Sequence, residues 1–267
     1  MNGEAKAGNE GEAEPPKSAA LLEVRSVSKR FGDLAAVRDV SLSVARGELR
    51  AIIGPNGAGK TTFFNLLGGF FPPTSGKIVF DGRDVTMLAA HRRAGLGMAR
   101  TFQITEIFPE LSVRENLRVG AEIAGGYALR PWISRAGRAA VQALVDQTLE
   151  LAGLTAKADR LVGELAHGDQ RVVEIATALT LRPRLLLLDE PTAGMGDQET
   201  YAATKLIREL RKRGDLSIVL IEHDMRVVFH LADRITVLDQ GKLLAEGAPA
   251  EIAANAAVQA AYLGEAA

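Results

Sequence analysis

GPNGAGKTT, residues 54–62, is the most diagnostic segment of this chain, because it matches the pattern G-x-x-x-x-G-K-[ST] without a gap. The preceding GELRAIIG, residues 47–54, has the apolar character of a strand, and GKTTFFNLLGG continues as a helix. Glycines let successive backbone N–H groups point inward around phosphate oxygens, and the helix presents its positive end to the same anion. The sequence therefore predicts a phosphate-binding loop between a strand and a helix.

Each residue of this loop is a candidate nucleotide contact. Lys60 is expected to reach the β- and γ-phosphates, and the Thr61 hydroxyl is expected to ligate Mg²⁺. The alternative is a glycine-rich loop that only caps a helix, and the strand before the loop and the helix after it disfavour that interpretation. The candidate set is Gly54, Pro55, Asn56, Gly57, Ala58, Gly59, Lys60, Thr61 and Thr62.

A second segment, LRPRLLLLDEPTAG at residues 181–194, carries two acids to the end of an apolar run. Its consecutive leucines leave no polar face, which predicts a strand covered on both sides. Unpaired buried carboxylates are costly, and ligands of parallel sheets lie beyond the carboxyl ends of the strands. We expect Asp189 to act on the metal ion and Glu190, pointing the other way, to polarise the water that attacks the γ-phosphate. Alternatively, the two acids only cap the next helix.

Strands alternate with helices along most of the chain, which predicts a parallel sheet. LLEVRSVSKRF alternates like a strand, and a helical subdomain is expected at about residues 112–165. Ser112 and Glu115 have capping-box spacing, and residues 137–153 have the apolar stripe of a helix. GGYALRPWIS, which contains the single tryptophan, has the character of an inserted loop. Beyond it we expect a helix from about Gly168, a helix through Leu206 and Leu210, the strand LSIVLIE and the hairpin ITVLDQGKLLAEG.

The composition is that of an ordinary globular protein, with 267 residues, 47% hydrophobic and 24% charged residues. The net charge of −1 gives no basic field that would favour nucleic acid. The absence of cysteine excludes disulfides, thiolate metal sites and a cysteine nucleophile. No apolar run approaches the ~18 residues of a membrane-spanning helix. Residues 1–20 are small, acidic and proline-containing, and we expect them to form a disordered tail.

Four further segments make the chain, from Leu21 onward, resemble the ATP-binding subunits of ABC transporters. They are RTFQITEIF with Gln103, VLIEHDM with His223, KRFG with Phe31, and LAHGDQR at residues 165–171. The resemblance implies an α/β fold in one ATP-binding domain, residues 21–267. This fold has a P-loop NTPase (RecA-like) core, an antiparallel β subdomain and an inserted α-helical subdomain.

The resemblance also implies a role for each matching residue. Gln103 would sense Mg²⁺ and face the transmembrane subunits, His223 would contact the γ-phosphate, and the Phe31 ring would stack on adenine. LAHGDQR occupies the place of the family's signature motif, usually LSGGQ, whose helix start grips the γ-phosphate bound to a second subunit. The candidate contacts from this motif are Ala166, His167, Gly168 and Asp169.

The chain departs from the family pattern at two places. Ala166 replaces the signature serine and His167 replaces the first signature glycine, so one hydroxyl donor is missing. In the D-loop, AGMGD, Gly196 takes the position of the usual aspartate. These departures, together with the tryptophan-containing insert and the ending AYLGEA, resemble the larger ATPase subunit of branched-chain amino acid uptake systems. Relatives of that group import amides, urea or aromatic acids, and the solute stays open.

The resemblance therefore implies an ATPase that uses ATP and Mg²⁺ at the cytoplasmic face of the inner (plasma) membrane as a peripheral subunit. Its expected partners are transmembrane permease subunits, a second ATP-binding subunit of the same or a different chain, and indirectly a solute-binding protein; no nucleic acid is expected. Ile104, Ile107 and Phe108 lie where the family docks its membrane partner, although ordinary core packing is an equal alternative.

Other functions fit less of the sequence. Lipopolysaccharide-export ATPases share the YLGE ending but usually carry LSGGE. Soluble ABC proteins of translation or DNA repair usually have two cassettes or a long coiled coil, whereas this chain has one phosphate loop and no sustained heptad run. Adenylate and nucleoside kinases share the phosphate loop but need neither a signature motif nor a switch histidine.

Overall fold

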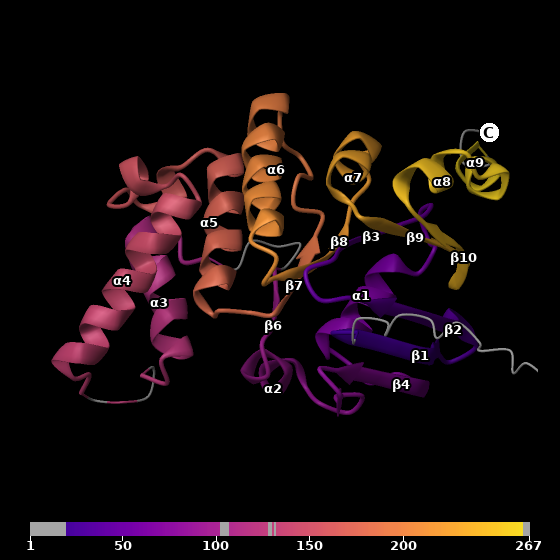
Figure 1. Cartoon of the computed structure of the whole chain (residues 1–267), viewed down its shortest axis with the longest axis horizontal. Helices are drawn as coiled ribbons and strands as arrows, with labels where there is room; N and C mark the ends of the chain where they lie inside the picture. The colour runs from indigo at the N-terminus through magenta and orange to yellow at the C-terminus, as the bar shows by residue number, and fades with distance from the viewer. Residues whose placement is uncertain (1–19, 102–106, 128–129, 131, 264–267) are drawn as a thin grey trace, which may run out of the picture.

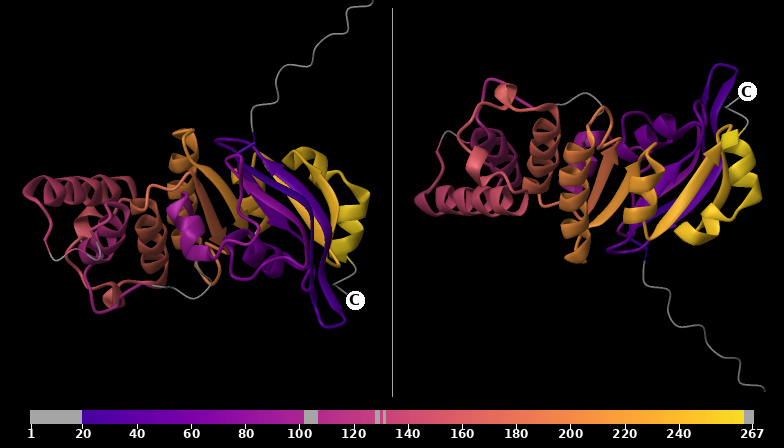
Figure 2. Two further views of the ribbon diagram at one scale, coloured as in Figure 1. Left: turned by 90° about the horizontal axis from the view of Figure 1, so that it is seen from below. Right: turned by 90° about the horizontal axis from the view of Figure 1, so that it is seen from above.

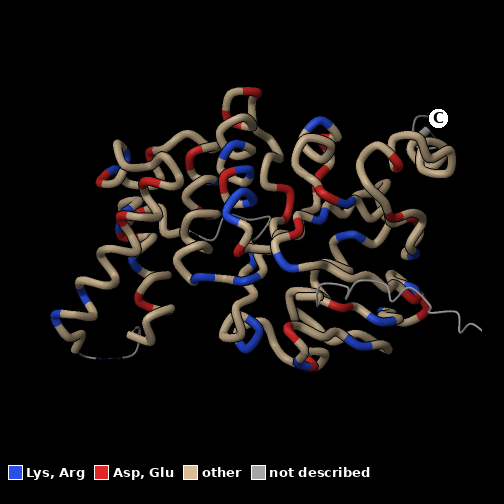
Figure 3. Tube along the Cα trace, viewed as in Figure 1, with Lys and Arg blue, Asp and Glu red and all other residues tan. Residues whose placement is uncertain are grey.

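The structure is a computed structural model that describes residues 20–101, 107–127, 130 and 132–263. Two β-sheets face a shared apolar core, and helices cover the outer side of the larger sheet (Figure 1). Helices α3 (Val113–Ala124) and α4 (Arg135–Leu151) lie at one end of the molecule. The smaller sheet lies at the other end, with α8 (Pro249–Ala253) and α9 (Ala256–Leu263) (Figure 2). Figure 3 shows Lys and Arg interspersed with Asp and Glu along the trace. Within the described part of the chain, no helix is long and apolar enough to span a membrane.

The larger sheet has the strand order β10-β9-β3-β8-β7-β6. All neighbouring strands pair in parallel except β10, which forms an antiparallel hairpin with β9, as the sequence predicts. The bounds are β3 Leu49–Ile53, β6 Met98–Arg100, β7 Leu185–Asp189, β8 Ser217–Ile221, β9 Arg234–Asp239 and β10 Lys242–Gly247. The family's α/β P-loop architecture is therefore present.

The smaller sheet is antiparallel, with the order β2-β1-β4-β5. Its strands are β1 Leu22–Phe31, β2 Leu34–Val44, β4 Ser75–Phe80 and β5 Arg83–Asp84. Strand β2 was not predicted, whereas the strand predicted within residues 47–54 is present as β3 of the larger sheet. A register shift at Asp39, where φ is +51°, breaks the alternation between the buried Val37 and Val40. This irregularity hides the two-residue period on which strand prediction depends.

The helices of the described chain follow β3, β7 and β8 in the βα pattern, precede β6, lie between β6 and β7, or lie at the C-terminal end. They are α1 Lys60–Gly68, α2 Ala90–Gly95, α3 Val113–Ala124, α4 Arg135–Leu151, α5 His167–Thr180, α6 Asp197–Lys212, α7 Met225–Leu231, α8 Pro249–Ala253 and α9 Ala256–Leu263, with short 3₁₀ turns at Thr155–Lys157 and Val162–Glu164. Helix α5 begins one residue before the predicted Gly168. The sequence analysis did not predict α2, β6, α8 or α9.

The packing of strand β7 on both faces explains why its leucines leave no polar face. Leu186 and Leu188 point into the core beneath the helices α3 to α7, while Leu185 and Leu187 point into the core shared with α1 and the smaller sheet. All four side chains are at most 1% exposed. The strand is therefore covered on both sides, and its end at Asp189 is fixed by two separate cores.

Helix α3 begins with the predicted capping box, because the Ser112 hydroxyl accepts from the Glu115 N–H and the Glu115 carboxylate accepts from the Ser112 N–H. Helix α4 buries the predicted stripe of Val141, Val145, Thr148 and Leu149, with Leu144 partly buried. The limits of a helical subdomain at 112–165 stay a prediction. The predicted tail lies outside the described residues, apart from the partly buried Ala20.

Candidate active site

The phosphate-binding loop follows β3 and ends at the start of α1, as predicted. Gly54, Gly57 and Gly59 have φ angles of +150°, +75° and +92°. A Cβ atom on Gly54 would lie 2.0 Å from the carbonyl oxygen of Leu238, and one on Gly59 would lie 2.4 Å from that of Ala36. Only glycine therefore fits at these two positions, and the loop can wrap closely around an anion.

Lys60 is the buried cation of this loop. Its side chain bends back over the loop, and Nζ donates to the carbonyl oxygens of Gly54 at 2.6 Å and Pro55 at 2.9 Å. The residue is 6% exposed, so the ammonium group is held in place rather than free in solvent. This charge lies beside the N-terminus of α1, where both the helix and the lysine favour a phosphate.

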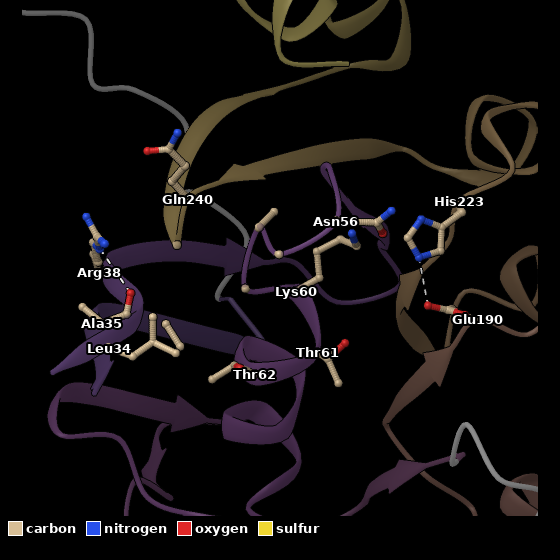
Figure 4. A pocket seen from close by; sticks show the side chains of 15 residues that line it. Leu34, Ala35, Arg38, Asn56, Lys60, Thr61, Thr62, Glu190, His223 and Gln240 are labelled. Carbon is tan, nitrogen blue, oxygen red and sulfur yellow. Dashed lines mark hydrogen bonds and ion pairs between the residues drawn. The ribbon is translucent and has the colours of Figure 1, made fainter. Parts of the chain in front are cut away.

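A cavity of about 620 Å³ opens over the loop (Figure 4). Most of the predicted loop residues line it, together with both predicted hydrolytic residues. Residues of β2 and of the β9–β10 turn also line the cavity, and these were not predicted. The lining residues are Leu34, Ala35, Ala36, Arg38, Asn56, Gly57, Ala58, Gly59, Lys60, Thr61, Thr62, Glu190, His223, Gln240 and Gly241.

The unpredicted β2 and β9–β10 residues are bonded to the phosphate loop through the backbone. The Arg38 N–H donates to the Gly241 carbonyl at 2.7 Å, and the Gly241 N–H donates to the Ala58 carbonyl at 3.0 Å. The apolar Leu34 and Ala35 thus lie beside the loop, where they can cover part of a bound nucleotide. The residual alternation in LAAVRDVSLSV was the available signal for β2, and the bulge at Asp39 obscured it.

Phe31 lies at the end of β1 and is 47% exposed, but it is not among the residues that line the cavity. Its ring packs edge-on against Phe71, with 5.5 Å between ring centroids, and the Lys29 ammonium lies 5.1 Å from its centroid. Adenine stacking on Phe31 stays a prediction. Gln103 and Ile104 lie outside the described residues.

Asp189 is 1% exposed at the end of β7, and its carboxylate is paired rather than isolated. Arg100, at the end of the adjacent β6, donates to Asp189 Oδ2 at 2.8 Å and to Asn65 Oδ1 at 2.7 Å. The guanidinium also lies over the rings of Phe64 and Phe70. Burial lowers the pKa of Arg100, and the Asp189 carboxylate opposes this shift. The cost of burying Asp189 is therefore offset within the protein.

Glu190 turns to the opposite side of the chain, as predicted. Its φ of +47° is unusual for a residue other than glycine, and its Oε1 lies 2.9 Å from His223 Nε2 (Figure 4). The His223 side chain is 49% exposed and that of Glu190 is 18% exposed, so both line the open cavity. The carboxylate and the imidazole are thus held together beside the phosphate loop, in reach of a water molecule.

Glu222, which the sequence analysis did not identify, is a buried acid behind this pair. Its Oε1 accepts from the Thr192 N–H at 2.9 Å and the Thr192 hydroxyl at 2.6 Å, and its Oε2 accepts from the His223 N–H at 3.0 Å. The Glu222 carboxylate thus links Thr192, in the loop after Glu190, to His223, whose side chain contacts Glu190. Thr192 and Glu222 are 30 residues apart in sequence, which is why no local motif reveals their contact.

The signature residues lie at the start of α5, and they do not line the cavity of their own chain. Ala166 is the N-cap residue and makes no side-chain cap. The Gly168 N–H donates to Glu199 Oε1 at 3.2 Å, and Asp169 pairs with Lys157 at 2.5 Å. His167 is exposed. Within the described chain, this helix start is therefore separate from the phosphate loop.

A glycine-lined phosphate loop, a buried lysine and a strand-end Asp-Glu pair beside a histidine define a P-loop ATPase of the ATP-binding cassette type. A family model described as ABC transporter matches residues 37–193. A second model, Branched-chain amino acid ATP-binding cassette transporter, matches residues 242–267. The chain belongs to the ABC transporter family, as an ATP-binding subunit that hydrolyses ATP.

The chain is similar over most of its length to curated relatives. The high-affinity branched-chain amino acid transport ATP-binding protein BraF of Pseudomonas aeruginosa is 43% identical over 252 residues, 92% of this chain and 98% of the relative. The corresponding LivG of Escherichia coli is 42% identical over the same shares. Among solved structures, the ADP conformation of the ATP-binding cassette MJ1267 has a TM-score of 0.79 and 31% identity, covering 92% of this chain and 99% of that one.

Proposed function

We propose that this chain drives uptake of branched-chain amino acids or chemically related small solutes by hydrolysing Mg²⁺-ATP. The main support is the sequence identity of 42–44% over 252 residues with ATP-binding proteins of branched-chain amino acid transport. The match of residues 242–267 to a branched-chain amino acid model supports the same solute class at the C-terminal end. The solute itself would bind to other subunits, so its class rests on these similarities.

The loop geometry supports a role for each residue in holding the nucleotide. Backbone N–H groups of residues 54–62 and the Lys60 ammonium would bind the phosphates. Mg²⁺ would neutralise charge on the phosphates and would be held by oxygen atoms of Thr61 and Asp189. These are hard oxygen donors of the kind that Mg²⁺ prefers, and Mg²⁺ usually completes its shell with water and substrate phosphates rather than a protein cage. The expected contribution of Gln103 falls outside the described residues.

The Glu190–His223 pair supports water activation. The Glu190 carboxylate can orient a water and take its proton, while His223 Nε2, 2.9 Å from Glu190 Oε1, holds the carboxylate towards the cavity. The His223 side chain is 49% exposed and lines the cavity, where it would contact the γ-phosphate. Hydrolysis would then need both side chains. Glu190 would activate the water, and His223 would hold the Glu190 carboxylate in position relative to the phosphate.

A second ATP-binding subunit would complete the site. Ala166, His167, Gly168 and Asp169 would contact the nucleotide of that subunit through the N-terminus of α5. Their separation from their own cavity supports this arrangement. Lys157 neutralises Asp169, which removes the repulsion that an acid would otherwise exert on a phosphate.

Permease subunits would dock beside the segment that contains Gln103. Phe108 is 52% exposed, and its backbone is held by two hydrogen bonds to the Asn116 amide, at 2.8 Å and 2.9 Å. Ile107 is partly buried against the core. An exposed aromatic ring on a fixed backbone is suited to a protein contact. Through the permease, the chain would serve a solute-binding protein from the cytoplasmic face of the inner membrane.

The experiment is reconstitution of the chain with its permease subunits and solute-binding protein in vesicles. The binding protein is screened against branched-chain amino acids, amides, urea and aromatic acids, and ATP-dependent solute movement is followed. We expect uptake of one branched-chain amino acid, abolished by Glu190→Gln. Movement of substrate in the export direction, or binding of only urea or amides, would contradict the proposed solute or direction.

A further inference from the structure

Arg171 is a buried arginine on α5 whose side chain reaches the end of β7. Its side chain is 6% exposed, and Nη2 donates to the carbonyl oxygen of Asp189 and, at 3.3 Å, to that of Glu190. Nη1 donates to Glu174 Oε2 at 2.5 Å. One cation thus holds two successive carbonyl oxygens at the strand end, with its charge balanced by Glu174. Charge-assisted hydrogen bonds of this kind are among the stronger ones in proteins.

These carbonyls flank the backbone turn that separates the two strand-end acids. Glu190 has the left-handed φ of +47°, which a side chain bearing a Cβ adopts only when its surroundings enforce it. The Glu190 N–H donates to the Ile221 carbonyl at 3.0 Å, and the Ala193 N–H donates to the Glu190 carbonyl at 3.1 Å. Arg171 supplies the remaining restraint from the helix side. Without it, the carbonyls of Asp189 and Glu190 would lose their charged donor.

We infer that Arg171 is a positioning residue for Glu190. It fixes the left-handed turn that aims Glu190 at His223 while Asp189 faces Arg100. Arg171 touches neither nucleotide nor water in this scheme and acts only through the backbone of Glu190. The inference rests on the proposed role of Glu190 in orienting water. It also connects the first turns of α5 directly to the backbone of Glu190 in the same chain.

The competing interpretation is that Arg171 only stabilises the fold, as many buried arginines do. The chain offers a matched control in Arg93, which is 1% exposed and donates to backbone carbonyl oxygens outside the β7 end. Its acceptors are Leu66, Leu67, Thr86 and Leu88. Loss of either arginine removes a charged donor from backbone carbonyl oxygens, so both substitutions should lower stability, but only those of Arg171 should affect the chemistry.

The test compares Arg171→Met, Arg171→Lys and Arg93→Met in the full chain, assembled with its partner subunits. For each variant, kcat, KM for ATP, equilibrium nucleotide affinity and Tm are measured at a temperature where all are folded. We expect Arg171→Met to lower kcat by roughly 10- to 100-fold, since a misplacement of ~1 Å can cost that much. Nucleotide affinity should stay within about twofold of wild type.

The lysine variant should recover part of the lost kcat, because its ammonium group can reach one carbonyl but not both. Arg93→Met should lower Tm with wild-type kcat. A wild-type kcat in either Arg171 variant, or equal kcat losses in Arg171→Met and Arg93→Met, would overturn the inference. Should Arg171→Met not fold, the lysine variant decides. Glu190→Gln is measured alongside: if it stays active, the role of Glu190 has failed rather than that of Arg171.

Discussion

Arg100 and Asp189 form a buried ion pair, with 2.8 Å between Nη2 and Oδ2, where the parallel strands β6 and β7 end side by side. Their side chains are 9% and 2% exposed. The pair lets a carboxylate occupy the end of a fully buried strand, and the same carboxylate is the proposed Mg²⁺ ligand. Arg100 also donates to Asn65 of α1, so the pair joins the end of β7 to the helix that follows the phosphate loop.

The first prediction concerns this pair. Arg100→Met would leave the Asp189 charge buried without its partner, which typically costs about 3–5 kcal/mol. We expect a loss of this order in the free energy of unfolding, measured by urea denaturation without nucleotide. The double variant Arg100→Met, Asp189→Asn should recover part of it, because no charge is then left unpaired. A loss of less than about 1 kcal/mol for the single variant would mean that solvent or another group screens Asp189.

The second prediction concerns Glu222. In Glu222→Gln one acceptor oxygen is lost, and the amide NH₂ would face a donor from either Thr192 or His223. We expect a loss of about 1–3 kcal/mol in unfolding free energy and a fall in kcat with little change in nucleotide affinity. Glu251→Gln is a suitable control, since that exposed side chain only caps α8. An unchanged kcat in a folded Glu222→Gln protein would show that catalysis does not depend on the hydrogen bond from the His223 N–H to the Glu222 carboxylate.

The third prediction separates a membrane contact from core packing. Phe108→Asp should leave the subunit folded and able to bind nucleotide, since the ring is 52% exposed, but it should uncouple transport from hydrolysis. Ile107→Asp is the matched control, because Ile107 packs against the core and an unpaired charge there should lower Tm. Transport and ATPase rates in vesicles are compared with the Tm of the isolated chains. If Phe108→Asp itself unfolds the subunit, the docking role is wrong.

The fourth prediction concerns the altered signature motif. Ala166 is the N-cap of α5 without a side-chain cap, and Ala166→Ser restores a hydroxyl at that position. We expect a tighter ATP-bound dimer or faster turnover, by up to ~1 kcal/mol for one added hydrogen bond. The measurement is ATPase rate and dimer population in the assembled transporter. Turnover that is unchanged or lower would indicate a site already adapted to alanine.

Sequence reasoning succeeded where the physics is local. The phosphate loop, the capping box of α3 and the hairpin of β9 and β10 are each encoded within a few consecutive residues, and all have the predicted form. The fold class followed from the alternation of strands and helices together with the family resemblance.

The contacts that sequence reasoning missed join residues far apart in the chain. Arg100 pairs with an acid 89 residues away, Arg171 with carbonyls 18 and 19 residues away, and Glu222 with a threonine 30 residues away. No short pattern distinguishes such a charge from an ordinary surface residue. These groups come together only because of the order of strands in the sheet, and no single sequence segment predicts that order.

The last prediction returns to the two acids, whose substitutions should fail differently. Glu190→Gln keeps the shape of the side chain but cannot take a proton from water. Mg²⁺-ATP should still bind, and the ATP-bound dimer should accumulate with kcat lower by roughly 10²–10⁴-fold. Asp189→Asn removes charge beside Arg100 and at the proposed Mg²⁺ site, so Mg²⁺-ATP affinity should weaken before any chemistry. Affinity for ATP without Mg²⁺ should change much less.

The measurements are ATPase rate, nucleotide affinity with and without Mg²⁺, and dimer population for both variants. Asp159→Asn serves as the control, because that acid is 87% exposed, pairs with Arg114 and does not line the cavity. A near-native ATPase rate in Glu190→Gln would reduce the second acid to a structural group at the turn. Equal loss of Mg²⁺-dependent binding in both variants would instead place both carboxylates on the metal, and the assignment of separate roles to the two sides of the β7 end would be wrong.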